Sequence, residues 1–196
     1  MHFFGNVISK NNSNQSSNNK SADDSGSEIL EAKNGVENVG TAVFRQDRLV
    51  GTLTHLETVA HLIITGGVKS CNISMPDPED KDNLIDLYFD FTSKPKIDVS
   101  IVNGSPYIKI KIKANATISS IKQLSNKNTE DQIKLTQKYA NNYLERLLLH
   151  YLYKTSKNFN SDIDGLGKYS LQNFFTSKQF EQYSWLENYK NAFAHF

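Results

Sequence analysis

The chain has almost none of the residues that build disulfide or metal frameworks. Cys71 is the only cysteine among 196 residues, so neither an intramolecular disulfide nor a cysteine-rich zinc site can form. We expect Cys71 to be a small apolar core residue, as free cysteines commonly are. One thiol does not define a redox compartment.

Long hydrophobic runs are missing as well. No run approaches the roughly 18 apolar residues that a membrane-spanning helix needs. The N-terminus lacks the basic start, apolar stretch and small-residue cleavage site of a signal peptide. The chain as given is therefore expected to be soluble.

Neither sign of charge is in excess. The 22 basic and 21 acidic residues give a net charge of +1, so no large field of one sign attracts nucleic acid or acidic lipid. Arginine, the usual residue for bidentate contacts to phosphate and bases, occurs only at positions 45, 48 and 146. We expect no nucleic-acid partner.

The composition changes along the chain. Hydrophobic residues make up 38% of the sequence and aromatic residues 11%, which is enough to bury a domain-sized core. Residues 10–35 are rich in Asn and Ser and poor in apolar side chains, so we expect a disordered linker there. Residues 1–9 are interpreted as the remnant of a preceding domain, and residues 36–196 as the folded domain.

Alternating apolar and polar residues predict the strands. Each predicted strand buries one face only, which is typical of an antiparallel sheet covered on one side. The first expected element is a hairpin over residues 39–50 with its loop at Gln46-Asp47-Arg48, and Gly51 is expected to let the chain leave this hairpin. Two single strands are expected over residues 71–75 and 85–91. A second hairpin is expected to pair residues 97–101 with 108–112 across the loop 103–106.

Helical spacing of apolar residues predicts two main helices. The first covers residues 53–65, with Thr54 and Glu57 as its capping box and Gly66 as its stop. The second runs from Thr129 to about Ser156, with Gln132 as the capping partner of Thr129. Its expected apolar stripe consists of Ile133, Ala140, Leu144, Leu147 and Tyr151.

Shorter helices over residues 169–175 and 178–193 are expected to end the chain. They carry an aromatic cluster that we assign to the core, with a partner groove as the alternative; its members are Phe180, Tyr183, Trp185, Tyr189, Phe193 and Phe196. The predicted fold class is α+β, with a mainly antiparallel sheet of about four to five strands and the helices packed on one face.

Several motifs match catalytic or metal sites only in part. His55 and Glu57 have the His-x-Glu spacing of zinc deaminases, but the partner cysteines are absent, so a helix cap beside a surface histidine is expected. His61 is expected to be a partly buried, hydrogen-bonded histidine. The alternation of Lys109, Lys111 and Lys113 with isoleucines could touch phosphate or lipid headgroups, but a solvated face or a protected edge strand is expected instead.

The segment 162–167 resembles part of a calcium-binding loop. Asp162, Asp164 and Gly167 occupy positions one, three and six, but Leu166 stands at position five and Asn173 where the bidentate Glu should be. We therefore expect a turn in which both aspartates cap neighbouring backbone, and Gly165 and Gly167 adopt special dihedral angles.

No Gly-x-Ser-x-Gly nucleophile elbow or phosphate-binding glycine loop occurs. An enzyme is not expected, and neither catalytic residues, metal nor cofactor are assigned.

In their order, these motifs resemble the C-terminal domain of the spore germination receptor C-subunit family, the Ger(x)C lipoproteins of endospore-forming bacteria. The likeness covers about residues 39–196, and Tyr189 replaces a family Trp while the usual Pro before the last helix is absent. The residues that carry it, interpreted as structural, are Gly40, Phe44, Gly51, Glu57, Gly66, Asp162, Gly165 and Gly167.

The resemblance implies a non-enzymatic subunit of a nutrient germinant receptor, with two integral-membrane subunits as partners, at the outer face of the spore inner membrane. Family members carry a lipoprotein signal and a lipid-bearing cysteine, which this sequence lacks, and residues 3–8 are similar to the last helix of the preceding family domain. A small-molecule module that senses nutrient through its aromatic residues is the alternative, and a hydrolytic enzyme is third.

Overall fold

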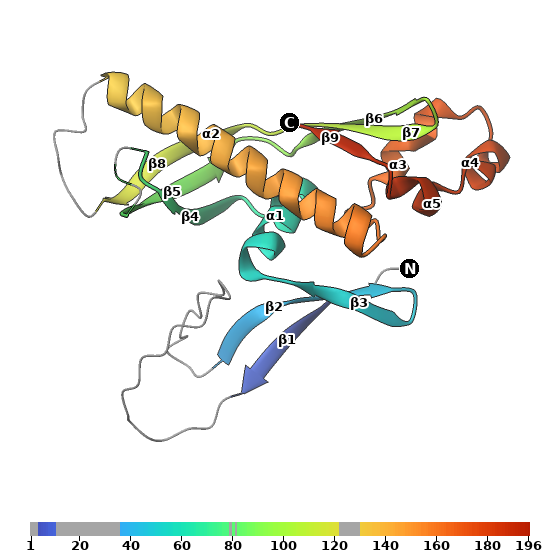
Figure 1. Ribbon diagram of the computed structural model, residues 1–196, viewed down its shortest axis with the longest axis horizontal. Coiled ribbons are helices and arrows are strands. Elements are labelled where there is room, and N and C mark those ends of the chain that lie inside the picture. Colours follow the sequence, from blue (N-terminus) through green and yellow to red (C-terminus); the bar gives the residue numbers. More distant parts are fainter. Residues whose placement is uncertain (1–3, 11–35, 79, 81, 122–129) are drawn as a thin grey trace. The chain divides into compact units, whose positions relative to one another are not determined.

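The computed structural model of the protein describes residues 4–10, 36–78, 80, 82–121 and 130–196. Internal contacts divide the chain into two units, Met1–Thr58 and Val59–Phe196. In chain order the elements are β1 (Phe4–Lys10), β2 (Val36–Arg45), β3 (Arg48–Leu53), α1 (His55–Thr65), β4 (Ser70–Pro76), β5 (Leu84–Phe91), β6 (Lys96–Val102), β7 (Ser105–Lys111), β8 (Ala114–Ile121), α2 (Glu130–Tyr153), the π-helical turn η1 (Lys154–Asn158), α3 (Gly167–Ser170), the 3-10 turn η2 (Leu171–Asn173), α4 (Ser177–Tyr183), α5 (Trp185–Tyr189) and β9 (Phe193–His195) (Figure 1).

The first unit holds an antiparallel sheet in the order β1-β2-β3. The predicted hairpin is confirmed, but its loop is the two residues Gln46 and Asp47, with Gln46 at φ 58°. The expected third loop residue, Arg48, pairs with Arg45 and begins β3 instead. Gly51 lies inside β3 opposite Val43, so its expected role at the exit of the hairpin is wrong. Gly40 is required by space, because a Cβ there would lie 2.1 Å from the Leu53 carbonyl oxygen.

Residues 4–10 form strand β1 and not the helix that their likeness to a preceding domain indicated. The segment contains Phe4, Val7 and Ile8, which favour a pleated strand, and Gly5, which disfavours a helix interior. The boundaries at 1–9, 10–35 and 36–196 stay predictions, and residues 11–35 lie outside the part that the structure describes.

Both ends of α1 follow the predicted chemistry. The Thr54 N–H donates to Glu57 Oε2 at 2.7 Å, and the Glu57 N–H donates to Thr54 Oγ1 at 3.4 Å, which confirms the capping box. Gly66 is left-handed at φ 69°. The N–H of Gly67 bonds to the Leu62 carbonyl at 2.8 Å, as in a Schellman motif, so the predicted glycine stop is also confirmed.

In the second unit, one strand pair from each of the two three-stranded sheets joins into a long antiparallel ribbon. The pairing of β5 with β8 continues as the pairing of β6 with β7, across a break at residues 92–95 and 112–113. The Thr92 N–H bonds to the Lys113 carbonyl at 3.0 Å and links the two parts. β4 adds to the outer side of β5, and β9 adds in parallel to β7.

The ribbon turns at Asn103 and Gly104, which have φ angles of 50° and 79°. The expected four-residue loop 103–106 was too long, because an Asn-Gly pair closes a hairpin in two residues and leaves Ser105 and Pro106 to begin β7. Ile110 pairs with Ile97 and Ile108 with Val99, as the alternation predicted.

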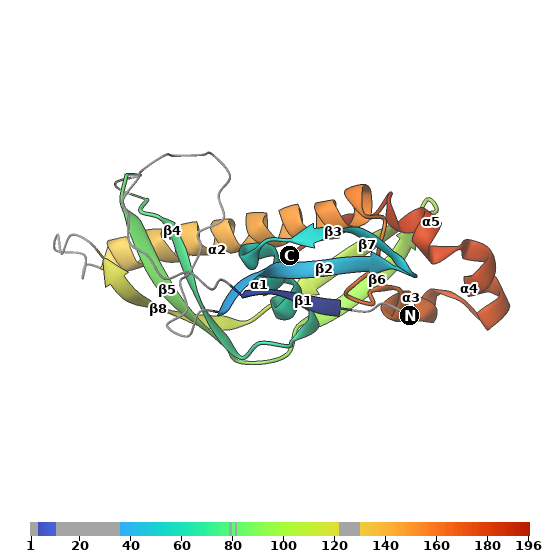
Figure 2. The same cartoon turned by 90° about the horizontal axis from the view of Figure 1, so that it is seen from below.

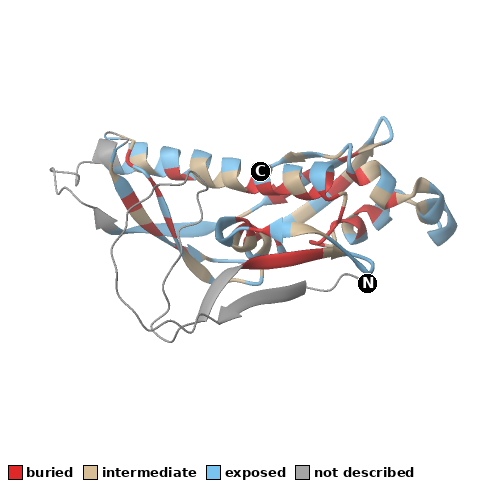
Figure 3. Ribbon diagram, turned by 60° about the horizontal axis from the view of Figure 1, so that its bottom comes forward, coloured by how far each residue is buried: buried red, intermediate tan, exposed pale blue. Residues whose placement is uncertain are grey.

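The long helix lies along this ribbon, as Figures 1 and 2 both show. Its buried residues lie mainly in the C-terminal half (Figure 3), where Leu148 and Leu152 are buried beside the predicted Tyr151. Ile133 was expected in the stripe but is 54% exposed. The predicted cap formed by Thr129 and Gln132 lies outside the described residues and side chains.

The C-terminal segment departs from its prediction. The expected helix over residues 178–193 is divided into α4 and α5 at Ser184, which is left-handed at φ 51°. Thr176 and Gln179 form a capping box at the start of α4. The α+β class, the antiparallel sheets, the long helix and the short C-terminal helices are confirmed, although nine strands are described where four to five were expected.

The helices of the described part are too short or too polar to cross a lipid bilayer.

Candidate functional site

A buried carboxylate organises the loop before α3. Asp162 accepts hydrogen bonds from the N–H groups of Leu166 and Gly167, both at 2.7 Å, and from Trp185 Nε1 at 2.8 Å. The predicted capping role is therefore confirmed for Asp162. The Asp162 side chain therefore holds the loop backbone and α5 in position relative to each other.

The two glycines of this loop serve different purposes. Gly165 is left-handed at φ 67°, as predicted. Gly167 is not left-handed, so the same prediction is wrong there. A Cβ on Gly167 would lie 2.8 Å from the Cδ1 and Nε1 atoms of Trp185, so glycine is needed for the close approach of the indole ring.

Asp164 does not cap the neighbouring backbone as expected. Its Oδ1 atom accepts from His61 Nδ1 and from the Tyr151 hydroxyl, both at 2.8 Å. His61 Nδ1 also lies 3.1 Å from the Tyr151 hydroxyl oxygen. His61 is only 12% exposed, so the expectation of a partly buried, hydrogen-bonded histidine is confirmed. The cluster ties α1 and α2 to the loop.

Burial dominates the protonation behaviour of this region. It raises the pKa of Asp164, although the hydrogen bonds and charge of His61 act in the opposite direction. The pKa of Tyr151 is raised well above its usual value by burial first and then by Asp164. The pKa of Tyr189 is raised in the same way, by burial and then by the charge of Asp162.

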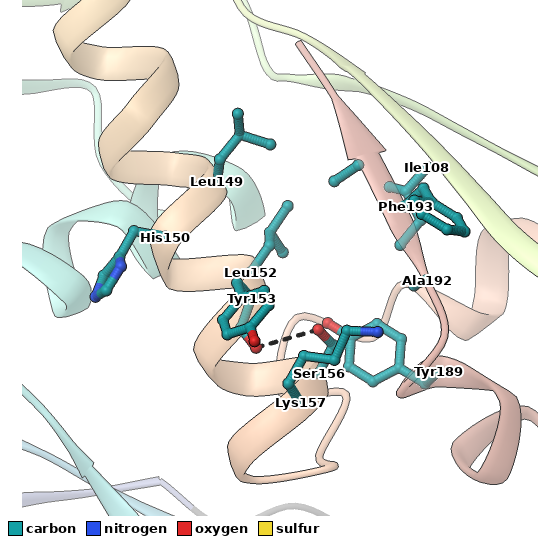
Figure 4. Close-up of a pocket in the computed structure, with 11 residues that line it drawn as sticks. Ile108, Leu149, His150, Leu152, Tyr153, Ser156, Lys157, Tyr189, Ala192 and Phe193 are labelled. Carbon is teal, nitrogen blue, oxygen red and sulfur yellow. Dashed lines mark hydrogen bonds between the residues drawn. The ribbon is translucent and has the colours of Figure 1, made fainter.

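An apolar cleft of about 440 Å³ lies between α2 and β9 (Figure 4). Ile108, Leu149 and Leu152 contribute to its apolar lining. Tyr153 comes from α2 and Phe193 from β9, and these two side chains are 60% and 66% exposed. The cleft thus has an apolar lining and aromatic residues on two sides.

Most polar residues of the cleft belong to α2 and η1, and Tyr189 comes from α5. The Ser156 hydroxyl donates to the Tyr153 carbonyl at 3.2 Å, which is the contact dashed in Figure 4. Lys157 Nζ donates to the carbonyl oxygen of Lys190. His150 also lines the cleft and is exposed. The eleven described lining residues include no carboxylate.

The predicted aromatic core is only partly a core. Trp185 and Tyr189 are buried with ring centroids 5.7 Å apart, as expected. Phe193 stands at the cleft instead, and Phe175, outside the predicted cluster, is 98% exposed.

The lysine row lies on a solvated face, because Lys109 and Lys111 are exposed while Ile108 and Ile110 are buried. Its strand is not an edge strand, since β9 pairs with the side of β7 that β6 leaves open. Cys71 is only half-buried, and burial raises the pKa of its thiol.

The residues that carry the family resemblance fall into two groups. Gly40, Phe44, Gly51 and Glu57 belong to the first unit, and Gly66, Asp162, Gly165 and Gly167 to the second. Of these, the structure brings Asp162 and Gly167 together at Trp185, and Gly165 lies in the same loop. No set of three or more His, Cys, Asp or Glu side chains converges as metal ligands within the described residues.

Sequence reasoning did not find the partnership of Asp164 with His61 and Tyr151. Tyr151 was assigned to an apolar stripe, and His61 was expected to be partly buried and hydrogen-bonded, with no partner named. A clue was available, because polar groups that are expected inside the fold need hydrogen-bond partners. The cleft was missed because it depends on β9, a three-residue strand whose pairing is set by distant contacts.

Two comparisons with known proteins agree with this fold. The family model described as "Spore germination B3/ GerAC like, C-terminal" matches residues 39–195. The crystal structure of the GerBC protein matches with a TM-score of 0.64 at 20% identity, over 83% of this chain and 51% of the GerBC chain. The chain thus spans about half the length of that protein, and the likeness at this identity concerns the fold.

No curated protein matches the chain. The family model covers well over half of the sequence, and the resemblance that the motifs indicated is confirmed. The chain belongs to the family of spore germination B3/GerAC-like C-terminal domains.

Proposed function

We propose that the chain is a non-enzymatic interaction domain of a germinant receptor C subunit in bacterial spore germination. The observation that carries this proposal is the use of the buried polar groups. The cluster closest to a catalytic arrangement, His61 with Asp164 and Tyr151, has both Tyr151 and Asp164 buried and joins three segments of the fold. The exposed residues of the second unit include large apolar side chains such as Tyr153, Phe175 and Phe193 beside charged residues of both signs, which suits contact with other proteins.

The proposed partners are the integral-membrane subunits of the receptor, at the outer face of the spore inner membrane. The membrane attachment would come from a lipid anchor elsewhere in the full protein, since Cys71 lies inside β4 and is half-buried. The family-motif residues then have a structural task, which is to hold the loop, caps and turns that shape the contact surfaces.

Deletion of the gene in a spore former tests the proposal. We expect slow or absent germination with at least one nutrient and restoration by the wild-type gene. Unchanged germination with every nutrient tested would count against the receptor role.

Complementation with the Asp164→Asn variant separates an interaction role from catalysis. Asn keeps an acceptor oxygen for His61 and Tyr151, so we expect germination to follow the amount of folded protein. Loss of germination at a wild-type protein level would instead favour an enzyme.

A small-molecule binding module is the second candidate, and the cleft of about 440 Å³ is the observation that favours it. Calorimetric titration of the chain with amino acids and sugars tests it. Saturable heat that disappears in a Leu149→Trp variant, which would fill the cleft, would support nutrient binding there.

A further inference from the structure

The cleft between α2 and β9 leaves two aromatic rings exposed to water. Tyr153 is 60% exposed and Phe193 is 66% exposed, and both line the cleft. Covering exposed aromatic surface lowers the free energy of the complex. Tyrosine and other aromatic residues are accordingly enriched at binding hot spots. The two rings therefore mark this site for a partner that covers more than the cleft itself.

The apolar lining between the rings offers a place for an anchoring side chain. Leu149 and Leu152 come from consecutive turns of α2, and Ile108 comes from β7 (Figure 4). The volume of about 440 Å³ can receive one large side chain together with part of the backbone that carries it.

Basic residues follow the same helix past the cleft. They recur at a spacing that places them on neighbouring turns, and the sequence has no Asp or Glu between Glu145 and Asp162. Basic side chains also suit the negative C-terminal end of a helix. The members of this basic stripe are Arg146, His150, Lys154 and Lys157.

Lys157 and His150 bring the basic stripe to the lining of the cleft. Lys157 Nζ bonds to the neutral carbonyl of Lys190, so this contact does not cancel its charge. Since the eleven described lining residues include no carboxylate, the cleft complements an anion in its charge and an apolar side chain in its lining.

We propose that this cleft docks a protein segment in which one large apolar residue is flanked by carboxylates. The apolar residue enters between Tyr153 and Phe193, and the carboxylates meet the basic stripe. The inference rests on the proposed interaction role and names the surface and the chemistry of the partner that would carry it.

Selection of a random dodecapeptide library on the full chain tests the proposal. We expect enriched peptides to share an aromatic or branched aliphatic residue next to Asp or Glu. Their binding, measured by fluorescence anisotropy, should weaken about tenfold or more with Tyr153→Ala, as for an interface hot spot. Lys157→Glu should weaken it similarly, and the affinity should fall with added salt.

Matched controls come from exposed residues outside the lining of the cleft. Phe175→Ala removes an aromatic ring that is 98% exposed, and Lys178→Glu reverses an exposed charge. Neither should change peptide affinity by more than about twofold, since surface substitutions away from a contact have small effects. Circular dichroism of the four variants checks that each is folded.

Several outcomes would overturn the proposal. These are no enrichment, enrichment of basic peptides, or peptides that bind the Tyr153 and Lys157 variants as tightly as the wild type. Saturable binding of 3-phenylpropionate in the cleft with no peptide enriched would assign the site to a small apolar acid. Binding of vesicles rich in phosphatidylglycerol that needs Lys157, without peptide binding, would assign it to a lipid surface.

The selection does not depend on germination, so its failure is distinct from failure of the receptor role. If deletion abolishes germination and no peptide is enriched, the docking surface is wrong and the receptor role stands. If peptides bind as expected and deletion has no effect, the receptor role is wrong.

Discussion

Asp162 shows how much one side chain can organise when it is buried. Its two oxygens accept from two backbone N–H groups and one indole N–H. Asparagine has the same shape but supplies only one acceptor oxygen, and its NH₂ group would face donors. Hydrogen bonds to a charged acceptor contribute about 1.5–3 kcal/mol each, so this position depends on the carboxylate.

Asp162→Asn should therefore lower the free energy of unfolding by about 2–4 kcal/mol, because at least one buried N–H loses its acceptor. Urea unfolding followed by the fluorescence of Trp185, the only tryptophan, measures the change. Asp98→Asn is the control, since that carboxylate is exposed and accepts from the Gln172 amide at 2.8 Å. Equal effects of the two substitutions would contradict the assigned role of Asp162.

The two loop glycines should respond differently to substitution. Gly167→Ala places a methyl group against the Trp185 ring and should cost about 1–3 kcal/mol, with a shift of the fluorescence maximum. Gly165→Ala meets no atom within 4 Å but must adopt a left-handed angle, which costs about 1–2 kcal/mol.

Asparagine separates these two causes, because it tolerates left-handed angles. Gly165→Asn should recover much of the loss seen with alanine, measured in the same urea experiment. Gly167→Asn should be at least as harmful as Gly167→Ala. The opposite pattern would mean that the causes at the two glycines are interchanged.

At the scale of helices and strands, the predictions succeeded where interactions between residues close in sequence determine the element. The α1 capping box, its glycine stop and the inward faces of β5, β6 and β7 all follow from residues close together in sequence. β8 was missed because Ala114–Ile121 lacks an apolar alternation, and its residues 114–119 are exposed on both faces. The strand exists through its pairing with β5, which is a distant partner.

Thr54→Ala should cost about 1 kcal/mol, because the Thr54 hydroxyl accepts the Glu57 N–H at the start of α1. Chemical denaturation measures the loss. Thr54→Ser keeps the hydroxyl and should stay within about 0.5 kcal/mol of the wild type. If serine is as destabilising as alanine, packing of the threonine methyl group and not capping is responsible.

At the scale of the whole molecule, the buried polar groups make stability depend on pH. Tyr151 and Tyr189 have pKa values raised well above 10, mainly by burial. In the unfolded chain they ionise near their usual pKa, while in the folded chain they stay protonated. Unfolding therefore releases protons in alkaline solution, and the stability that these groups contribute is lost as pH rises above about 10.

We expect the free energy of unfolding to fall above about pH 10 with a slope approaching 1.4 kcal/mol per pH unit for each of the two tyrosines. Urea midpoints measured across this range test the slope. Tyr189→Phe should make the slope shallower by about 1.4 kcal/mol per pH unit, because one proton fewer is released on unfolding. A slope that is unaffected by Tyr189→Phe would contradict the prediction.

Most of the candidate site depends on contacts between distant parts of the chain, which limits how much of it could be predicted from the sequence. Asp162, Gly165 and Gly167 stand out in sequence because Asp and Gly are frequent in turns. The joining of Asp164 to His61 and Tyr151 spans separations of 103 and 13 residues, and no local pattern encodes which polar groups meet. The cleft needs α2, β7 and β9 together, so it becomes visible only in three dimensions.

Pairing across the long ribbon begins most easily at Asn103 and Gly104, where the loop to be closed is shortest, and then spreads outward past Thr92 and Lys113. Strand β9 joins in a different way, since Phe193 meets Tyr107 across a long stretch of chain. Contacts between distant residues form slowly. We therefore expect the β9 wall of the cleft to form late in folding. A partner that occupies the cleft would then bind the fully folded chain and not its folding intermediates.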